Sequence, residues 1–165
     1  QIDPADVRHG VGYVSQSSAL FHGTIRDNLT IGAPRATDNE MLAALAMVGA
    51  DAFVRRLPNG LAYPLMEGGK GLSGGQVQAL LLARMIIRQP RVVLLDEPTA
   101  SMDEAAERQF IRQFRRWATD RTVVVATHRM RVLDMVDRVI FLQNGEIIVD
   151  DKKDVVLERL RGAMA

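Results

Sequence analysis

The sequence predicts an α/β fold with a parallel sheet at its core and an inserted helical segment. Residues 91–96 (RVVLLD) and 121–127 (RTVVVAT) are continuous runs of mainly β-branched and aliphatic residues, typical of strands buried on both faces of a parallel sheet. Residues 103–118 lie between these runs and carry apolar side chains at helical spacing, so strand and helix alternate as in α/β proteins. Residues 37–89 show helical patterns, and we expect them to form an insert between sheet strands.

Turn and capping signals predict the other elements. Either Thr37 or Asp38 is a suitable N-cap for the first long helix. In chain order we expect a strand at 10–16, a short helical piece at 23–32, helices at 37–50 and 51–57, a glycine-rich loop at 66–75, a helix at 76–88, a short helix at 129–136, a strand at 138–143 that turns through Asn144-Gly145 into 146–150, and a final helix at 153–162. We group them into three parts of one domain, 1–36, 37–89 and 90–165.

Composition narrows the class of protein. The 165 residues suffice for one domain with a sizeable core, and the 47% apolar and 25% charged residues are ordinary for a globular protein. The net charge of +1 gives no electrostatic indication of nucleic acid or an anionic membrane as a partner. The absence of cysteine excludes disulfides and thiolate metal sites. No apolar run reaches the ~18 residues of a membrane-spanning helix, so a membrane role would need a partner or further polypeptide.

Two acidic residues, Asp96 and Glu97, end the predicted strand at 91–96. Ligands of α/β proteins bind beyond the carboxyl ends of the strands, and adjacent carboxylates are costly to bury without a positive charge such as Mg²⁺ on a nucleotide. A strand that simply leaves the core through acidic residues is the alternative. The aliphatic residues before the pair and Pro98 after it favour a nucleotide site, with Asp96 holding Mg²⁺ through water and Glu97 orienting or deprotonating the attacking water.

The stretch GLSGGQ, at 71–76, places three glycines directly before a predicted helix. A glycine pair can serve as a hinge or cap. It can also bring backbone N–H groups at a helix N-terminus close to a phosphate, with Ser73 adding a hydroxyl donor. The pair alone does not decide between a hinge and an anion site.

Five motifs together resemble those of the nucleotide-binding domains of ABC transporters, in the same order and over essentially the whole chain. They are GYVSQ (12–16, the Q-loop), LSGGQ (72–76, the signature), VVLLDEPT (92–99, Walker B and the catalytic glutamate), ASMD (100–103, the D-loop) and VVVATHR (123–129, the switch strand and its histidine). The resemblance implies a P-loop NTPase-like parallel sheet core, partial in this chain, with an inserted α-helical signature subdomain. It also implies ATP and Mg²⁺ as ligands, and it favours the anion site over the hinge.

The resemblance assigns a role to each matching residue. It implies Glu97, His128 and Gln16 as catalytic residues, with His128 on the γ-phosphate, and Asp96 and Gln16 at the metal. The residues implied in nucleotide binding are Leu72, Ser73, Gly74, Gly75, Gln76 and Asp103. Taken alone, Gln16 is an ordinary polar strand end, His128 a core histidine and Asp103 the N-cap of helix 103–118; the N-cap and nucleotide roles of Asp103 are compatible.

The sequence contains no P-loop of the form GxxxxGK[ST], which holds the β- and γ-phosphates in this class of ATPase. The segment MEGGKGLS, at 66–73, has glycine, lysine and serine but neither the spacing nor a preceding strand. In the family the P-loop precedes the Q-loop, and this chain begins at Gln1, so we expect further polypeptide upstream. We expect the isolated 165-residue chain to bind ATP weakly and not to hydrolyse it.

Segment 17–34, with LFHGTIRDNL, resembles exporters that carry membrane and ATPase domains on one polypeptide. Residues 98–103, 127–150 and 152–160 look most like bacterial type I secretion ATPases, although VDDKKD at 149–154 stands where the family often has a glycine and a proline. The resemblance implies an ATPase that powers protein or peptide export at the cytoplasmic face of the bacterial inner membrane. Its partners would be a second nucleotide-binding domain, head to tail, and a transmembrane domain, without nucleic acid. Lipid or drug export is the alternative within this class; a soluble ABC ATPase on DNA or ribosomes, or a non-catalytic interaction module, are the alternatives outside it.

Overall fold

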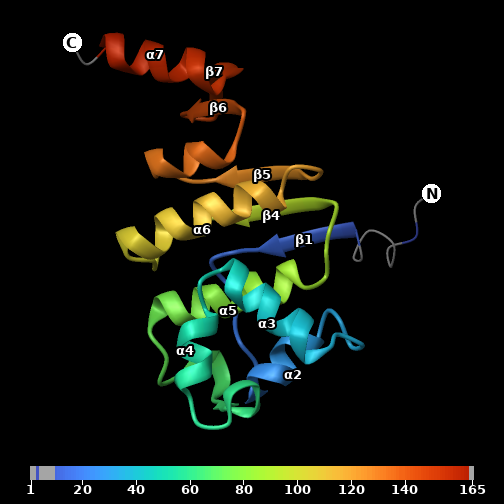
Figure 1. Ribbon diagram of the computed structural model, residues 1–165. Coiled ribbons are helices and arrows are strands. Elements are labelled where there is room, and N and C mark those ends of the chain that lie inside the picture. Colours follow the sequence, from blue (N-terminus) through green and yellow to red (C-terminus); the bar gives the residue numbers. More distant parts are fainter. Residues whose placement is uncertain (1–2, 4–9, 164–165) are drawn as a thin grey trace.

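The core of the fold is a three-stranded parallel sheet with the strand order β1-β4-β5 (Figure 1). The computed structural model describes residue 3 and residues 10–163. The strands are β1 (Val11–Val14), β4 (Val92–Asp96) and β5 (Thr122–Ala126). The register pairs Val14 with Leu95, and Leu95 with Val125, so all three strands end at the same edge of the sheet. The predicted α/β fold with a parallel sheet core is therefore confirmed.

The predicted insert is also present, because β1 pairs directly with β4 although residues 15–91 separate them. The elements between these strands are β2 (Gly23–Thr24), α2 (Ile25–Thr30), α3 (Asp38–Met47), α4 (Asp51–Arg56), the 3₁₀ turn η1 (Gly60–Ala62), β3 (Pro64–Leu65), the 3₁₀ turn η2 (Glu67–Gly69) and α5 (Gly74–Ile86). After β4 come α6 (Glu104–Trp117), β5, the 3₁₀ turn η3 (Met130–Met135), β6 (Arg138–Gln143), β7 (Glu146–Lys152) and α7 (Lys153–Ala163).

Side-chain caps determine where two of the long helices begin. The Thr37 hydroxyl accepts from the N–H of Glu40, and the Glu40 carboxylate accepts from the N–H of Thr37, so Thr37 and not Asp38 is the N-cap of α3. The helix predicted to begin at residue 76 begins instead at Gly74, with Ser73 as its N-cap. The prediction was wrong by two residues because it counted the glycines as loop.

The helices pack around the sheet through one continuous cluster of buried residues. α5 contacts β1 and α3, whereas α6 crosses in front of β4 and β5 in Figure 1. Phe110 and Phe114 of α6 are fully buried with ring centroids 5.2 Å apart, and they join β4 residues such as Val93 in the cluster. Among the described residues no helix combines the length and apolar character needed to cross a bilayer.

One of two expectations for strands in the C-terminal half is wrong. The segment predicted as a buried strand at 121–127 forms β5, but β5 has only β4 as a neighbour among the described strands, and Val124 is 56% exposed. The strand predicted at 138–143 is confirmed as β6, and the predicted turn at Asn144-Gly145 joins it antiparallel to β7, apart from the described parallel sheet. A run of apolar residues predicts a strand, but it does not predict which strands or helices lie beside that strand and bury it.

Candidate functional site at the carboxyl edge of the sheet

The parallel register brings residues predicted as catalytic or metal-binding to one edge of the sheet. Gln16 follows the end of β1 by two residues, Asp96 is the last residue of β4, and His128 follows the end of β5 by two residues. Gln16 and His128 are both exposed, so the alternative reading of His128 as a core histidine does not apply. These side chains share the edge because parallel strands that are in register all end there.

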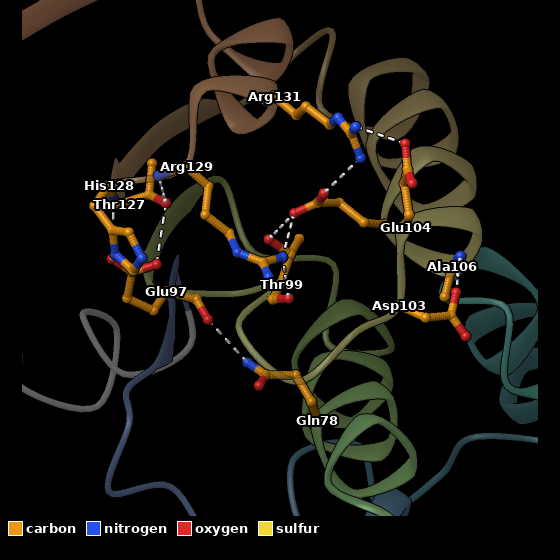
Figure 2. A network of polar contacts seen from close by, with 11 residues as sticks. Gln78, Glu97, Thr99, Asp103, Glu104, Ala106, Thr127, His128, Arg129 and Arg131 are labelled. Atoms are coloured by element: carbon orange, nitrogen blue, oxygen red, sulfur yellow. Dashed lines mark hydrogen bonds and ion pairs between the residues drawn. The ribbon is translucent and has the colours of Figure 1, made fainter.

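Glu97 is held by three hydrogen bonds from the segment that follows β5 (Figure 2). Its Oε1 lies 2.7 Å from Nδ1 of His128 and accepts from the His128 backbone N–H at 3.0 Å. Its Oε2 accepts from the Thr127 hydroxyl at 3.1 Å. The Glu97 side chain is 14% exposed and that of His128 is 81% exposed, so the carboxylate is recessed and the imidazole faces outward.

The surroundings of Glu97 favour its ionised form, and its backbone adopts a strained conformation. Burial alone would raise its pKa, but the hydrogen bonds from His128 and Thr127 and the charge of His128 outweigh burial and hold the pKa below its ordinary value of 4.5. The backbone of Glu97 has φ 47°, in the left-handed region that costs a non-glycine residue on the order of 1 kcal/mol. Strained residues of this kind concentrate at functional sites.

Asp96, at the end of β4, is the residue for which the sequence predicts a role at a metal. Within the part of the chain that the structure describes, its carboxylate makes no hydrogen bond or ion pair, and no group of three or more His, Cys, Asp or Glu side chains could hold a metal ion. Mg²⁺ is commonly bound by one or two carboxylates together with substrate phosphates and water, and it does not need a cage of protein ligands. A single accessible carboxylate at this edge is compatible with that mode of binding.

The signature residues 72–76 form the start of α5, a helix of 13 residues. The Ser73 hydroxyl accepts from the N–H of Gln76 at 3.3 Å, and the Gln76 side chain accepts from the N–H of Ser73 at 2.9 Å. Leu72 packs partly buried against the core, whereas Ser73 and Gly74 are exposed. Within residues 10–163, none of these signature residues has a hydrogen bond to Asp96, Glu97 or His128.

Close packing, and not a hinge, explains the glycine pair of the signature. Neither Gly74 nor Gly75 has a positive φ. A Cβ on Gly75 would lie 2.8 Å from the carbonyl oxygen of Ser101, and one on Gly74 would lie 3.3 Å from the Ser101 side chain. The 100–103 loop therefore rests on the first turn of α5. Asp103 ends this loop as the N-cap of α6, where its carboxylate accepts from the N–H of Ala106 at 2.8 Å.

Four residues that we did not single out from the sequence surround the edge: Gln78, Thr99, Glu107 and Arg129. The side chain of Gln78 donates to the carbonyl of Glu97 at 3.3 Å. Glu107 is buried, and it accepts from the Thr99 hydroxyl at 2.7 Å and from Arg129 at 2.6 Å. A signal for Glu107 was present in the sequence, since it precedes Phe110, Ile111 and Phe114 by three, four and seven residues and so lies on the apolar face of α6.

Acid is expected to weaken the fold through Glu107. Burial would raise its pKa, but the hydrogen bonds from Thr99 and Arg129 and the charges of Arg129 and Arg131 outweigh burial and lower the pKa from 4.5. A lowered folded-state pKa means that the stabilisation is fully present above about pH 4.5 and is lost as the pH falls through the folded-state value. Urea unfolding from about pH 6 to about pH 3 should show this decline, and Glu107→Gln should flatten it. An unchanged slope in that variant would contradict the assignment.

Comparison with known proteins gives the relatives of the chain. The family model described as ABC transporter matches residues 1–100. The cyclolysin secretion/processing ATP-binding protein CyaB of Bordetella pertussis is 38% identical over 146 residues, which is 88% of this chain and 20% of that protein. Multidrug resistance protein homolog 65 of Drosophila melanogaster is 34% identical over 157 residues, which is 95% of this chain and 12% of that protein.

A solved structure also matches the fold. The structure of a bacterial Atm1-family ABC exporter with ATP bound superposes with a TM-score of 0.86 and 30% sequence identity, over 94% of this chain and 27% of that one. The chain thus spans about a fifth or less of the length of the curated relatives named above. Because the family model covers residues 1–100 of 165, well over half of the sequence, this chain belongs to the ABC transporter family.

Proposed function

We propose that this chain carries catalytic residues of an ATPase that powers export across a membrane. The observation that carries the proposal is the pairing of a recessed, ionised Glu97 with an outward-facing His128 beyond the ends of neighbouring parallel strands. A carboxylate in this position can accept a proton from, or orient, a water molecule that attacks a phosphorus atom. The exposed imidazole can donate to the negative charge that develops on the transferred phosphoryl group.

Asp96 and Gln16 complete this proposed site from their own strand ends. Asp96 would hold Mg²⁺, directly or through water, and Gln16 would contact the metal or the attacking water. When bound, Mg²⁺ neutralises charge on the nucleotide phosphates. The four residues leave the same edge of the sheet on three strands, so one nucleotide γ-phosphate could contact all of them.

We propose that the signature acts on a different nucleotide from the one at Glu97. Ser73 and Gly74 are exposed at the N-terminus of α5, where unpaired N–H groups and the helix dipole favour a phosphate. Within the described residues, neither has a hydrogen bond to Asp96, Glu97 or His128 of its own chain. This arrangement supports a head-to-tail dimer in which the signature of one subunit, with Asp103 nearby, completes the ATP site of the other. The transmembrane partner would lie on the same polypeptide.

Protein or peptide secretion at the cytoplasmic face of the bacterial inner membrane is the favoured transport role. It rests on the 38% identity to CyaB, a protein named for cyclolysin secretion. Export of lipids or drugs is the second candidate, because a multidrug resistance protein is related at 34% identity. Transport by the complete polypeptide in vesicles, with a labelled peptide against a lipophilic dye, would separate these candidates.

The ATPase proposal predicts magnesium-dependent turnover. The polypeptide as the cell makes it should hydrolyse ATP with Mg²⁺. A chelator should abolish turnover, because the metal neutralises charge on the nucleotide phosphates and the Asp96 carboxylate, itself negative, cannot replace it. Release of inorganic phosphate, with and without chelator, measures this. Binding of nucleotide without any hydrolysis would instead favour a non-catalytic interaction module.

A further inference from the structure

We propose that Arg129, Glu107 and Thr99 form a clamp that positions Glu97 and His128 relative to each other, a role that rests on the proposed ATPase function. The clamp joins the segment after β5 to the segment after β4 and anchors both on α6 (Figure 2). Arg129 and Glu107 are thus positioning residues, since among the described residues neither has a hydrogen bond to the carboxylate of Glu97 or the imidazole of His128.

The need for a clamp follows from where the sheet ends. The last paired residues of β4 and β5 are Asp96 and Ala126, and the last backbone hydrogen bond runs from the N–H of Glu97 to the carbonyl of Ala126. Beyond it, within the described residues, no backbone–backbone hydrogen bond joins segment 97–99 to segment 127–129. Side chains alone therefore set the distance between these two segments.

The Arg129 side chain connects the two segments without bonding to Glu97 or His128. One of its guanidinium nitrogens donates both to the carbonyl of Thr99, at 2.9 Å, and to the carboxylate of Glu107, at 2.6 Å. Its backbone N–H donates to the Thr127 hydroxyl, which in turn donates to Glu97. A shift of Arg129 would therefore disturb the hydrogen bond that holds Oε2 of Glu97.

The other end of the clamp is rigid because it is buried. Thr99 is 0% and Glu107 5% exposed, and Glu107 lies on the face of α6 that also carries Phe110 and Phe114. The Glu107 carboxylate is further held by Arg131 at 3.7 Å, which also pairs with Glu104. Hydrogen bonds between ionised partners are about twice as strong as neutral ones, so this anchor resists displacement. Misplacement of catalytic groups by about 1 Å can lower a rate by about a hundredfold.

The test compares the ATPase kinetics of two arginine variants, made in the polypeptide as the cell makes it. Arg129→Gln is expected to lower kcat for ATP about tenfold and to leave KM within about twofold, because the clamp acts on the catalytic pair and not on nucleotide binding. Arg108→Gln is the matched control, since Arg108 also pairs with a glutamate of α6, Glu104, but on the exposed surface. It is expected to leave both constants unchanged.

A second readout does not depend on turnover. Amide hydrogen exchange of residues 127–129 should accelerate about tenfold in Arg129→Gln, whereas exchange in β4 and α6 should stay at the wild-type rate. If Arg129→Gln does not fold, Arg129→Lys carries the test: it keeps the charge, but a single ammonium reaches Thr99 and Glu107 less well, and an intermediate loss of kcat is expected.

The outcomes separate the clamp from the ATPase proposal. An unchanged kcat, a rise in KM alone, or faster exchange throughout the protein would overturn the clamp. Absence of ATP hydrolysis by the wild-type polypeptide would overturn the proposed function, and the local exchange rates would still decide whether Arg129 holds residues 127–129. Local acceleration together with a loss of kcat would support both.

Discussion

Glu97→Gln is expected to reduce ATP hydrolysis by about 10²–10⁴-fold while ATP binding persists, because general base catalysis contributes rate factors of that size. The amide is nearly isosteric with the carboxylate and retains an oxygen that can accept from Thr127 or His128, which both contact Glu97 here. It cannot take up a proton from water. Steady-state phosphate release and equilibrium binding of a labelled ATP analogue, on the complete polypeptide, measure the two effects separately.

The matched control for this experiment is Asp120→Asn. Asp120 is an exposed carboxylate in the turn between α6 and β5, away from the strand ends that carry the proposed site. This variant loses the same charge and should hydrolyse ATP at the wild-type rate. Turnover within about threefold of wild type in Glu97→Gln would remove Glu97 from the catalytic role and leave it as a structural ligand of His128.

Gly75→Ala is expected to destabilise the fold by about 1–3 kcal/mol, the usual cost of forcing an extra carbon into a packed position. The added Cβ would lie 2.8 Å from the carbonyl oxygen of Ser101, which is a backbone atom and cannot rotate away. The higher helix propensity of alanine, worth up to about 1 kcal/mol, offsets only part of this cost. The midpoint of urea unfolding measures the loss.

Gly74→Ala is the control one residue earlier. Its Cβ would lie 3.3 Å from the Cβ and Oγ of Ser101, where a shift of a few tenths of an ångström relieves the contact. Stability within about 0.5 kcal/mol of wild type is expected for this variant. If Gly75→Ala were as stable as Gly74→Ala, the loop at 100–103 would be shown to yield freely, and close packing would no longer explain the second glycine.

The strand ends of the candidate site could be predicted from the sequence. Asp96 follows an apolar run, and His128 follows another, and two parallel strands in register must bring their following residues to one edge. Neither apolar run predicts that the side chains of Glu97 and His128 pair with each other. It depends on the left-handed backbone at Glu97 and on the Thr127 hydroxyl, which only the three-dimensional structure brings together.

The supporting residues were harder to predict for physical reasons. Arg129 belongs to no helical or strand-like pattern of apolar residues that would reveal its role. Its partners Thr99 and Glu107 lie 30 and 22 residues away along the chain. The start of α5 was missed because glycines usually weaken a helix, whereas here the reciprocal hydrogen bonds of Ser73 and Gln76 support its first turn. The exposure of β5 was missed because strand patterns report apolar residues and not neighbouring strands.

The left-handed backbone at Glu97 places stability and activity in opposition at one residue. At φ 47° a glycine would be free of the steric conflict that a glutamate side chain creates, so the backbone alone would favour glycine there. A carboxylate is nevertheless required if the residue is to act on water. Selection for thermal stability alone would therefore tend to remove Glu97, and a search for stabilising substitutions in this protein should exclude position 97 from the start.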